Sequence, residues 1–204
     1  MKARISAYVV AVSIFALLPS VWAQDKPKNG NWGYHQFRLS SSTFSNGGTL
    51  PLSMVYNQCS YYPGGDDQSP ELSWNHAPWG TRSFVVILYD VTASFTHWGM
   101  YNIAPTRSGL PENAGVAGST YGTQIANDFG DISYDGPCPP PSLVPVSHQY
   151  VFTVYALDVV LPTLPTFGDF PPGAEALYHA LIEAGRSGDI LETASIDGFF
   201  PGTD

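Results

Sequence analysis

The chain has 204 residues, of which 17 are acidic and 8 are basic, so its formal charge at neutral pH is −9. Charged residues make up 12% of the chain and aromatic residues 14%, which excludes an intrinsically disordered protein. The acidic balance excludes binding to nucleic-acid backbones, because such binding needs clustered Lys and Arg. The length favours a single domain.

The N-terminus has the layout of a secretory signal peptide. Lys2 and Arg4 precede an apolar stretch at 7–18, and a small-residue pattern at 21–23 predicts cleavage after residue 23. The apolar stretch is short for a membrane span, and an uncleaved anchor is the alternative. We expect a cleaved signal peptide (1–23), a flexible leader (24–36) and one domain (37–204), with no transmembrane segment after cleavage. The expected location is secreted or periplasmic.

Two cysteines, Cys59 and Cys138, lie far apart in the sequence. In an oxidising compartment such an isolated pair predicts one disulfide, and two buried free thiols are the alternative. No cluster of cysteines with metal-ligand spacing is present in the sequence. We therefore expect no structural metal and no cofactor.

Short apolar runs alternate with Gly, Pro, Asn and Asp clusters from Phe37 onward, which predicts a mainly β domain. Three runs, at 83–90, 97–103 and 150–157, are apolar on both alternating faces. Such runs indicate central strands that are covered on both sides. A two-sheet sandwich satisfies this requirement, and so does one sheet with helices and loops on both faces.

One segment has helical spacing of its apolar residues, at 173–185. Gly185 is the expected end of this helix. The apolar stretch at 190–200 predicts a final strand.

Polar residues stand at the ends of the three central runs. Asp90 ends the first and His97 opens the second; in the third, His148 and Tyr150 are two apart and so point to the same face of a strand. If the runs are neighbours in one sheet, these four side chains converge at one edge. Imidazole N–H and phenolic O–H groups donate hydrogen bonds to anion oxygens, while the carboxylate orients one ring.

Each of these residues also has a purely structural interpretation. Asp90 fits a turn at a strand end, His97 a buried histidine with a partner, and His148 a solvent-facing strand start. Two His and one carboxylate would also fit a metal triad. The sequence has no Gly-x-Ser-x-Gly turn, Walker loop or dinucleotide fingerprint.

Two ordered motifs resemble those of the phosphatidylethanolamine-binding proteins. The first is SPELSW at 69–74, followed by PWGTRSF at 78–84, Asp90 and the His-Trp pair at 97–98. The second is YDGPCPP at 134–140, followed by HQY at 148–150. The resemblance spans roughly residues 37–200, and the Cys-Pro-Pro loop is most similar to the bacterial Raf-kinase-inhibitor-like branch.

The resemblance implies a β-sandwich in which a large antiparallel sheet packs with a smaller one, plus a C-terminal helix region. It also implies a small pocket for phosphate-like anions or phospholipid headgroups. Carried over by position, the pocket residues are Asp90, His97, Gly136, Cys138, His148 and Tyr150, with Gly136 and Cys138 contributing backbone groups.

The chain departs from the family pattern at three positions around this pocket. Thr92 stands in place of a second carboxylate, Ser94 in place of a proline, and Gln149 in place of an arginine. The lost carboxylate makes the pocket less negative, which favours an anion.

These observations predict an exported, non-catalytic binding protein whose partner is a small anion or a phospholipid headgroup. One alternative is an inhibitor of a protease or kinase-like protein through the rim of the pocket. Another is an enzyme that uses Asp90, the two histidines and Tyr150 as acid and base on an anionic small molecule.

Overall fold

A computed structural model describes residues 36–141, 147–166 and 173–201. The chain divides into two compact units, Met1–Tyr34 and His35–Asp204, and every described residue belongs to the second. The predicted signal peptide and all but the last residue of the predicted leader lie outside the described residues. No helix in the described part of the chain is long and apolar enough to cross a membrane.

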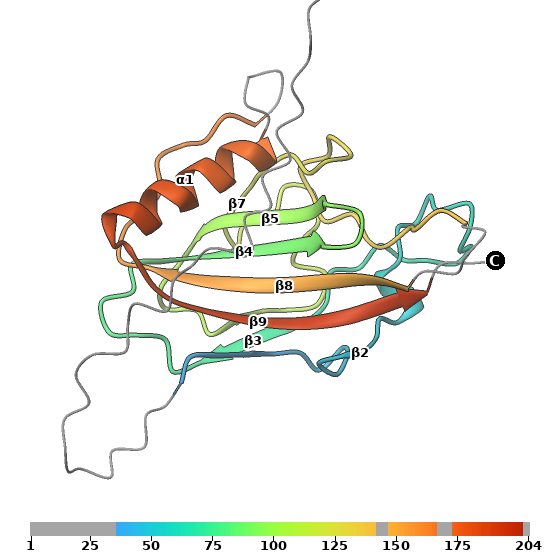
Figure 1. The fold of residues 1–204 in the computed structure, drawn as a ribbon, viewed down its shortest axis with the longest axis horizontal. Coiled ribbons are helices and arrows are strands. Elements are labelled where there is room, and N and C mark those ends of the chain that lie inside the picture. The colour runs from blue at the N-terminus through green and yellow to red at the C-terminus, as the bar shows by residue number, and fades with distance from the viewer. Residues whose placement is uncertain (1–35, 142–146, 167–172, 202–204) are drawn as a thin grey trace, which may run out of the picture. The chain divides into compact units, whose positions relative to one another are not determined.

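The described residues form two sheets and one α-helix (Figure 1). The smaller sheet has the order β1-β3-β6, and its strands are β1 (Arg38–Ser40), β3 (Leu72–Asn75) and β6 (Gly109–Leu110). The larger sheet has the order β2-β9-β8-β4-β5-β7. Its strands are β2 (Gly48–Thr49), β9 (Ile190–Pro201), β8 (Ser147–Leu157), β4 (Ser83–Asp90), β5 (Phe95–Ile103) and β7 (Thr123–Gln124).

The pairings in both sheets are antiparallel except that of β2 with β9, which is parallel. A short 3-10 turn, η2 (Leu52–Met54), follows β2. The predicted fold class, a mainly β sandwich of a larger and a smaller sheet with one helix near the C-terminus, is confirmed.

The side chains of β4 alternate between two cores. On one face they lie in the core shared with the smaller sheet: Phe84, Val86 and Leu88. On the other face they lie in the core shared with the helix: Val85 and Ile87. Figure 1 shows the same layering, with α1 and β3 on opposite sides of β4 and β8. Because both faces are covered, β4 has no polar alternation, as its sequence predicts.

The helix α1 (Gly173–Ser187) covers its face of the larger sheet with Leu177 and Leu181. The predicted end at Gly185 is wrong, since the helix continues to Ser187. Gly185 keeps the helical conformation, whereas Gly188 has φ +84° and ends the helix. Only the second glycine occupies the left-handed conformation that a helix end requires.

Cys59 and Cys138 form a disulfide, with their Cα atoms 5.6 Å apart. The predicted pairing is confirmed, and the alternative of two free thiols is wrong. Cys59 follows η2 and Cys138 belongs to the Pro-rich loop after β7, so the bond joins two loops that are distant in the sequence.

Candidate functional site

The ends of three neighbouring strands build the candidate site. β4 lies between β5 and β8 in the larger sheet, and in this register Asp90 is opposite Phe95 on one side and Tyr150 on the other. His148 lies two residues before Tyr150 on the same face of β8. The predicted convergence of these strand ends is therefore present in the structure.

A β-bulge brings His97 to this face. Leu88 pairs with Trp98, but the next residue of β4, Tyr89, pairs with Thr96, so His97 is an extra residue in β5. A bulge lets two consecutive side chains turn to one side of a sheet. The ring of His97 accordingly packs 5.2 Å from that of Tyr150, while Trp98 packs in the core between the sheets.

The converging residues line a pocket of about 190 Å³. Five of the six predicted site residues lie in its wall: Asp90, His97, Cys138, His148 and Tyr150. The remaining wall is apolar: Ala93, Phe95, Phe129, Pro139 and Pro140. Sequence reasoning missed the first three, whereas the two prolines belong to the motif at 134–140. A mostly apolar cavity with a few converging polar groups is typical of a small-molecule site.

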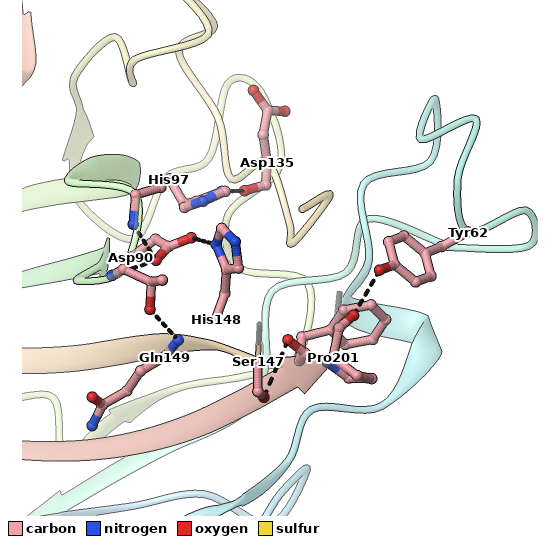
Figure 2. Close-up of polar contacts among 11 residues, drawn as sticks. Tyr62, Asp90, His97, Asp135, Ser147, His148, Gln149 and Pro201 are labelled. Atoms are coloured by element: carbon pink, nitrogen blue, oxygen red, sulfur yellow. Dashed lines mark hydrogen bonds and ion pairs between the residues drawn. The ribbon is translucent and has the colours of Figure 1, made fainter. Parts of the chain in front are cut away.

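Asp90 and His148 form the principal polar pair of the pocket (Figure 2). The Nδ1 atom of His148 donates to Oδ2 of Asp90 over 2.6 Å, and the side chains are 16% and 2% exposed. The other oxygen, Oδ1, accepts the backbone N–H groups of Thr92 and Ala93 at 2.8 and 3.0 Å. Asp90 is thus a buried carboxylate with both oxygens bonded, and it leaves Nε2 of His148 for a ligand.

His97 has the opposite hydrogen-bonding character to the one expected. Its Nδ1 donates to the carbonyl oxygen of Asp135 over 2.8 Å. Burial lowers the pKa of His97 to about 4, against the opposing effects of hydrogen bonds with the backbone of Asp135 and Gly136 and of the Asp90 charge. The ring is neutral at pH 7, and with its hydrogen on Nδ1 its other nitrogen, Nε2, has no hydrogen to donate. The expectation that His97 donates to an anion is therefore wrong.

Tyr150 is fully buried and supports Asp90. Burial, the charge of Asp90 and a hydrogen bond with that carboxylate all raise the pKa of Tyr150. The phenol consequently keeps its proton, and its hydroxyl group is directed to Asp90.

Gly136 does not line the pocket, in contrast to the sequence-based expectation. Its N–H donates to Oδ1 of Asp67 over 2.8 Å, and a Cβ added at this position would lie 1.7 Å from the carbonyl oxygen of Met54. Only glycine fits there, because the two backbone segments touch. Gly136 therefore positions the loop that carries Cys138.

Asp67 is a second residue that sequence reasoning missed, and no motif in the chain marks it. It has φ +55°, which Asp tolerates better than most residues. Burial raises its pKa to about 6; the hydrogen bond from Gly136 opposes this rise, and the charges of Asp135 and Asp131 add to it. Asp67 therefore holds the loop at an electrostatic cost.

Phe129 forms the exposed rim of the pocket, with 46% of its surface accessible. Its ring packs 4.6 Å from Phe95 and 5.7 Å from His97. The turn that presents it is held by Asn127, whose Oδ1 accepts the N–H groups of residues 129, 130 and 131. The Asn-Asp-Phe-Gly sequence at 127–130 is a recognisable turn signal.

Two of the three departures from the family pattern have structural roles beside the pocket. Thr92 accepts the backbone N–H of Gln149 on its Oγ1 at 3.0 Å, and the side chain of Gln149 donates to Asp197 over 2.7 Å. These bonds join the turn after β4 to β8, and β8 to β9. Ser94 has φ +56°, a conformation that the proline of the family pattern cannot adopt.

A wider hollow of about 390 Å³ lies beside β3 and β6. Its charged residues already have partners, since Glu71 accepts hydrogen bonds from Ser42 and Ser73, and the Arg107 guanidinium lies 4.4 Å from the ring of Tyr121. Within the described residues, no group of three or more His, Cys, Asp or Glu side chains is arranged to hold a metal ion. The pocket at Asp90 and His148 is therefore the candidate site.

Comparison with known proteins matches residues 40–200 to the phosphatidylethanolamine-binding protein family model. The chain belongs to the phosphatidylethanolamine-binding protein family. A UPF0098 protein of Aquifex aeolicus is 38% identical over 164 residues, which cover 78% of this chain and 85% of that protein. The Escherichia coli UPF0098 protein YbhB is 38% identical over 129 residues, covering 60% of this chain and 78% of YbhB.

The fold of this family member is also similar to a solved structure. The crystal structure of Escherichia coli YbcL, described as a member of the mammalian PEBP family, has a TM-score of 0.65 and 31% sequence identity. The similarity covers 80% of this chain and 97% of YbcL. The resemblance identified in the sequence is thus confirmed, and the chain is a bacterial-type member of the family.

Proposed function

We propose that this protein is exported and that its pocket binds one small phosphate-like oxyanion without converting it. The observation that carries the proposal is the 2.6 Å bond between His148 and Asp90. In its protonated form the His148 ring donates from both nitrogens, so Nε2 binds a ligand oxygen while Asp90 holds Nδ1. The aromatic wall excludes water and strengthens this contact.

Export is supported by the N-terminal pattern and by the disulfide. Disulfides form and persist outside the cytosol in most organisms. N-terminal sequencing of the protein recovered from culture fluid or periplasmic extract tests the proposal, and the expected first residue is Gln24. A chain that starts at Met1 and is recovered from the cytosolic fraction would contradict export.

Ligand binding is tested by thermal-shift titration with phosphate, acetate and glycerophosphoethanolamine. A ligand at about 100 times its Kd stabilises a protein by about 2.7 kcal/mol. We expect a shift that is lost in His148→Asn, whose amide still reaches Asp90 but offers nothing in place of Nε2. The matched control is His179→Asn, since His179 is an exposed helix residue. No shift with any of the three ligands would refute the proposal.

Acid–base catalysis is the second candidate function, and the same pair favours it. A carboxylate-oriented imidazole with its other nitrogen facing a pocket has the arrangement of a general base. Phosphorus NMR of small phosphate esters incubated with the protein distinguishes the two functions. Turnover that disappears in His148→Asn would establish the enzyme, and unchanged esters support the binding protein.

A further inference from the structure

The hollow beside β3 and β6 has the size of a ligand site. Its volume of about 390 Å³ is about twice that of the pocket at Asp90, and it lies in the range typical of ligand sites. Leu72 and Leu110 line it, but their side chains are buried in the core between the sheets, so they present backbone to the hollow. Thr106 and Ser108 are exposed in its wall. A ligand therefore meets a polar and open surface, which suits a peptide that lies along the sheet.

Arg107, in the wall of this hollow, is held in place by three contacts. Its backbone N–H donates to the carbonyl oxygen of Ala104 over 3.0 Å, and its own carbonyl oxygen accepts the Nε1–H of Trp74 over 3.1 Å. The guanidinium carbon lies 4.4 Å from the centre of the Tyr121 ring, whose negative face attracts a cation. Arg107 therefore presents its charge to the hollow from a defined position.

The N–H groups of the Arg107 side chain are available to a ligand. A guanidinium has five N–H donors, and its contact with the ring of Tyr121 leaves most of them for oxygen acceptors. Within the described residues, the Arg107 side chain has no ion pair and donates no hydrogen bond to an oxygen. Glu71 lies in the same wall, but its two oxygens accept from Ser42 and Ser73 instead. Among these residues, the charge of Arg107 is thus held in place without a carboxylate partner.

An open sheet edge lies next to Arg107. Among the described strands, β6 is the last of the smaller sheet and pairs with β3 alone. The N–H of Trp74 donates to the carbonyl oxygen of Ser108 over 2.8 Å, and bonded and non-bonded pairs alternate along an antiparallel ladder. Gly109, opposite Ser73, therefore directs its N–H and C=O to the outer side of β6. Backbone groups at such an edge can pair with an added strand.

The charge of the hollow favours a ligand with a single negative charge. Burial raises the pKa of Glu71, but the hydrogen bonds from Ser73 and Ser42 outweigh this effect and lower it below its ordinary value. Glu71 is therefore ionised at pH 7, and its charge opposes the binding of a dianion in the same hollow. A carboxylate has one charge, and its two oxygens match two parallel N–H groups of the Arg107 guanidinium. A carboxylate thus fits this wall better than a phosphate dianion.

We propose that this hollow is a second binding site of the protein, which takes an extended peptide segment with a carboxylate side chain. The peptide adds to the outer edge of β6, where its backbone pairs with the N–H and C=O of Gly109. Its carboxylate accepts two N–H groups of Arg107, and its carbonyl groups accept from the hydroxyl groups of Thr106 and Ser108. The hollow shares no wall residue with the pocket at His148, so this inference does not depend on the proposed anion binding.

Nitrogen NMR titration of the full chain at neutral pH tests the inference with two peptides, acetyl-Ala-Glu-Ala-amide and its uncharged match acetyl-Ala-Gln-Ala-amide. We expect the Glu peptide to shift the signals of the Gly109 backbone N–H and of the Arg107 Nε–H. We expect it to bind about fivefold more tightly than the Gln peptide, which is the contribution of an exposed ion pair of good geometry. This preference should be lost in Arg107→Gln and kept in Arg82→Gln, because Arg82 is an exposed arginine outside the hollow.

Several results would overturn the inference. Equal affinity for the two peptides would show that the carboxylate is not recognised, and unshifted signals of Gly109 with both peptides would show that the edge of β6 takes no strand. A preference that persists in Arg107→Gln would mean that another group binds the carboxylate. If Arg107→Gln does not fold, Arg107→Met replaces it, and the preference must be lost there. Shifts confined to His148 and Tyr150 would place the peptide in the other pocket and also overturn the inference.

Discussion

Asp90 and His148 are 58 residues apart in the sequence, yet Nδ1 of His148 donates to Oδ2 of Asp90 over 2.6 Å across the paired strands β4 and β8. The bond fixes the hydrogen of His148 on Nδ1. It also gives a buried carboxylate a partner without which its burial would be costly. The register of β4 with β8 therefore brings together the two residues that form the main polar contact of the pocket.

The substitution Asp90→Asn tests this contact directly. The Asn oxygen can still accept the N–H groups of Thr92 and Ala93, but its amide then donates to His148, so the hydrogen of the neutral ring moves to Nε2. We expect nitrogen NMR to report this change of tautomer. Because the neutral ring then donates from Nε2 and the buried negative charge is removed, we expect phosphate affinity, measured by calorimetry, to be kept or to rise.

Glu175→Gln is the matched control for Asp90→Asn, because Glu175 pairs with the exposed His179 at 3.7 Å. This control should leave the tautomer of His148 and the affinity unchanged. A His148 ring that keeps its hydrogen on Nδ1 in Asp90→Asn would contradict the assignment.

His97 should make the stability of the fold depend on pH. Its pKa is about 4 in the folded state, below the ordinary value of 6.5, so the unfolded chain binds its proton first on acidification. The contribution of the neutral ring is complete above pH 6.5 and is lost as the pH falls to 4, by about 3 kcal/mol. Urea unfolding at pH 7 and pH 4 should show this loss in the wild type and not in His97→Asn. Parallel losses in both proteins would disprove the role of His97.

Asp67→Asn should stabilise the protein at high pH. The pKa of Asp67 is raised to about 6, so its carboxyl is favoured in the protonated form and stability is lost as the pH rises from 4 to above 6. The Asn oxygen still accepts the N–H of Gly136, and Asn tolerates φ +55°. After a discount for solvent screening, we expect a gain of about 1 kcal/mol at pH 8 and none at pH 4.

Chemical denaturation at these two pH values measures the gain from Asp67→Asn. Asp66→Asn, at the exposed neighbouring residue, controls for the change in net charge. An equal gain in both variants would mean that overall charge, rather than the environment of Asp67, is responsible.

Removal of the disulfide should weaken the fold and the pocket together. The bond closes a loop between residues 79 apart, which in the chain-entropy model is worth about 4 kcal/mol. We expect the double variant Cys59→Ala/Cys138→Ala to lose stability of this order in urea unfolding. Because Cys138 lines the pocket, phosphate affinity should fall as well. A variant with wild-type affinity would show that Gly136 and Asp67 are sufficient to hold the loop.

The strands and their ends could be predicted from the sequence because a strand that is buried on both faces is a continuous run of apolar residues. The run at 83–90 coincides with β4, and Asp90 and His148 stand at the strand ends where polar residues were expected. The family motifs added the loop of Cys138. These features depend on which residue types follow one another along the chain, and this can be read from the sequence.

The remaining features depend on contacts between segments that are distant in the sequence. Nothing local indicates that Asp67 would accept the N–H of Gly136, or that Asp135 would present a carbonyl to His97. The hydrogen-bonding character of His97 follows from that carbonyl, so an acceptor was predicted as a donor. The end of α1 was also misplaced: Gly185 was predicted to end the helix, but it is Gly188, three residues later, that has the left-handed backbone conformation.

The bulge in β5 makes the length of that strand as important to the pocket as the identity of its residues. If one residue were deleted between Phe95 and Trp98, the regular pairing with β4 would place a single side chain where two now share a face. Either the imidazole would leave the pocket or the indole would leave the core. An insertion or deletion at this strand would therefore change the pocket even if every other pocket residue were kept.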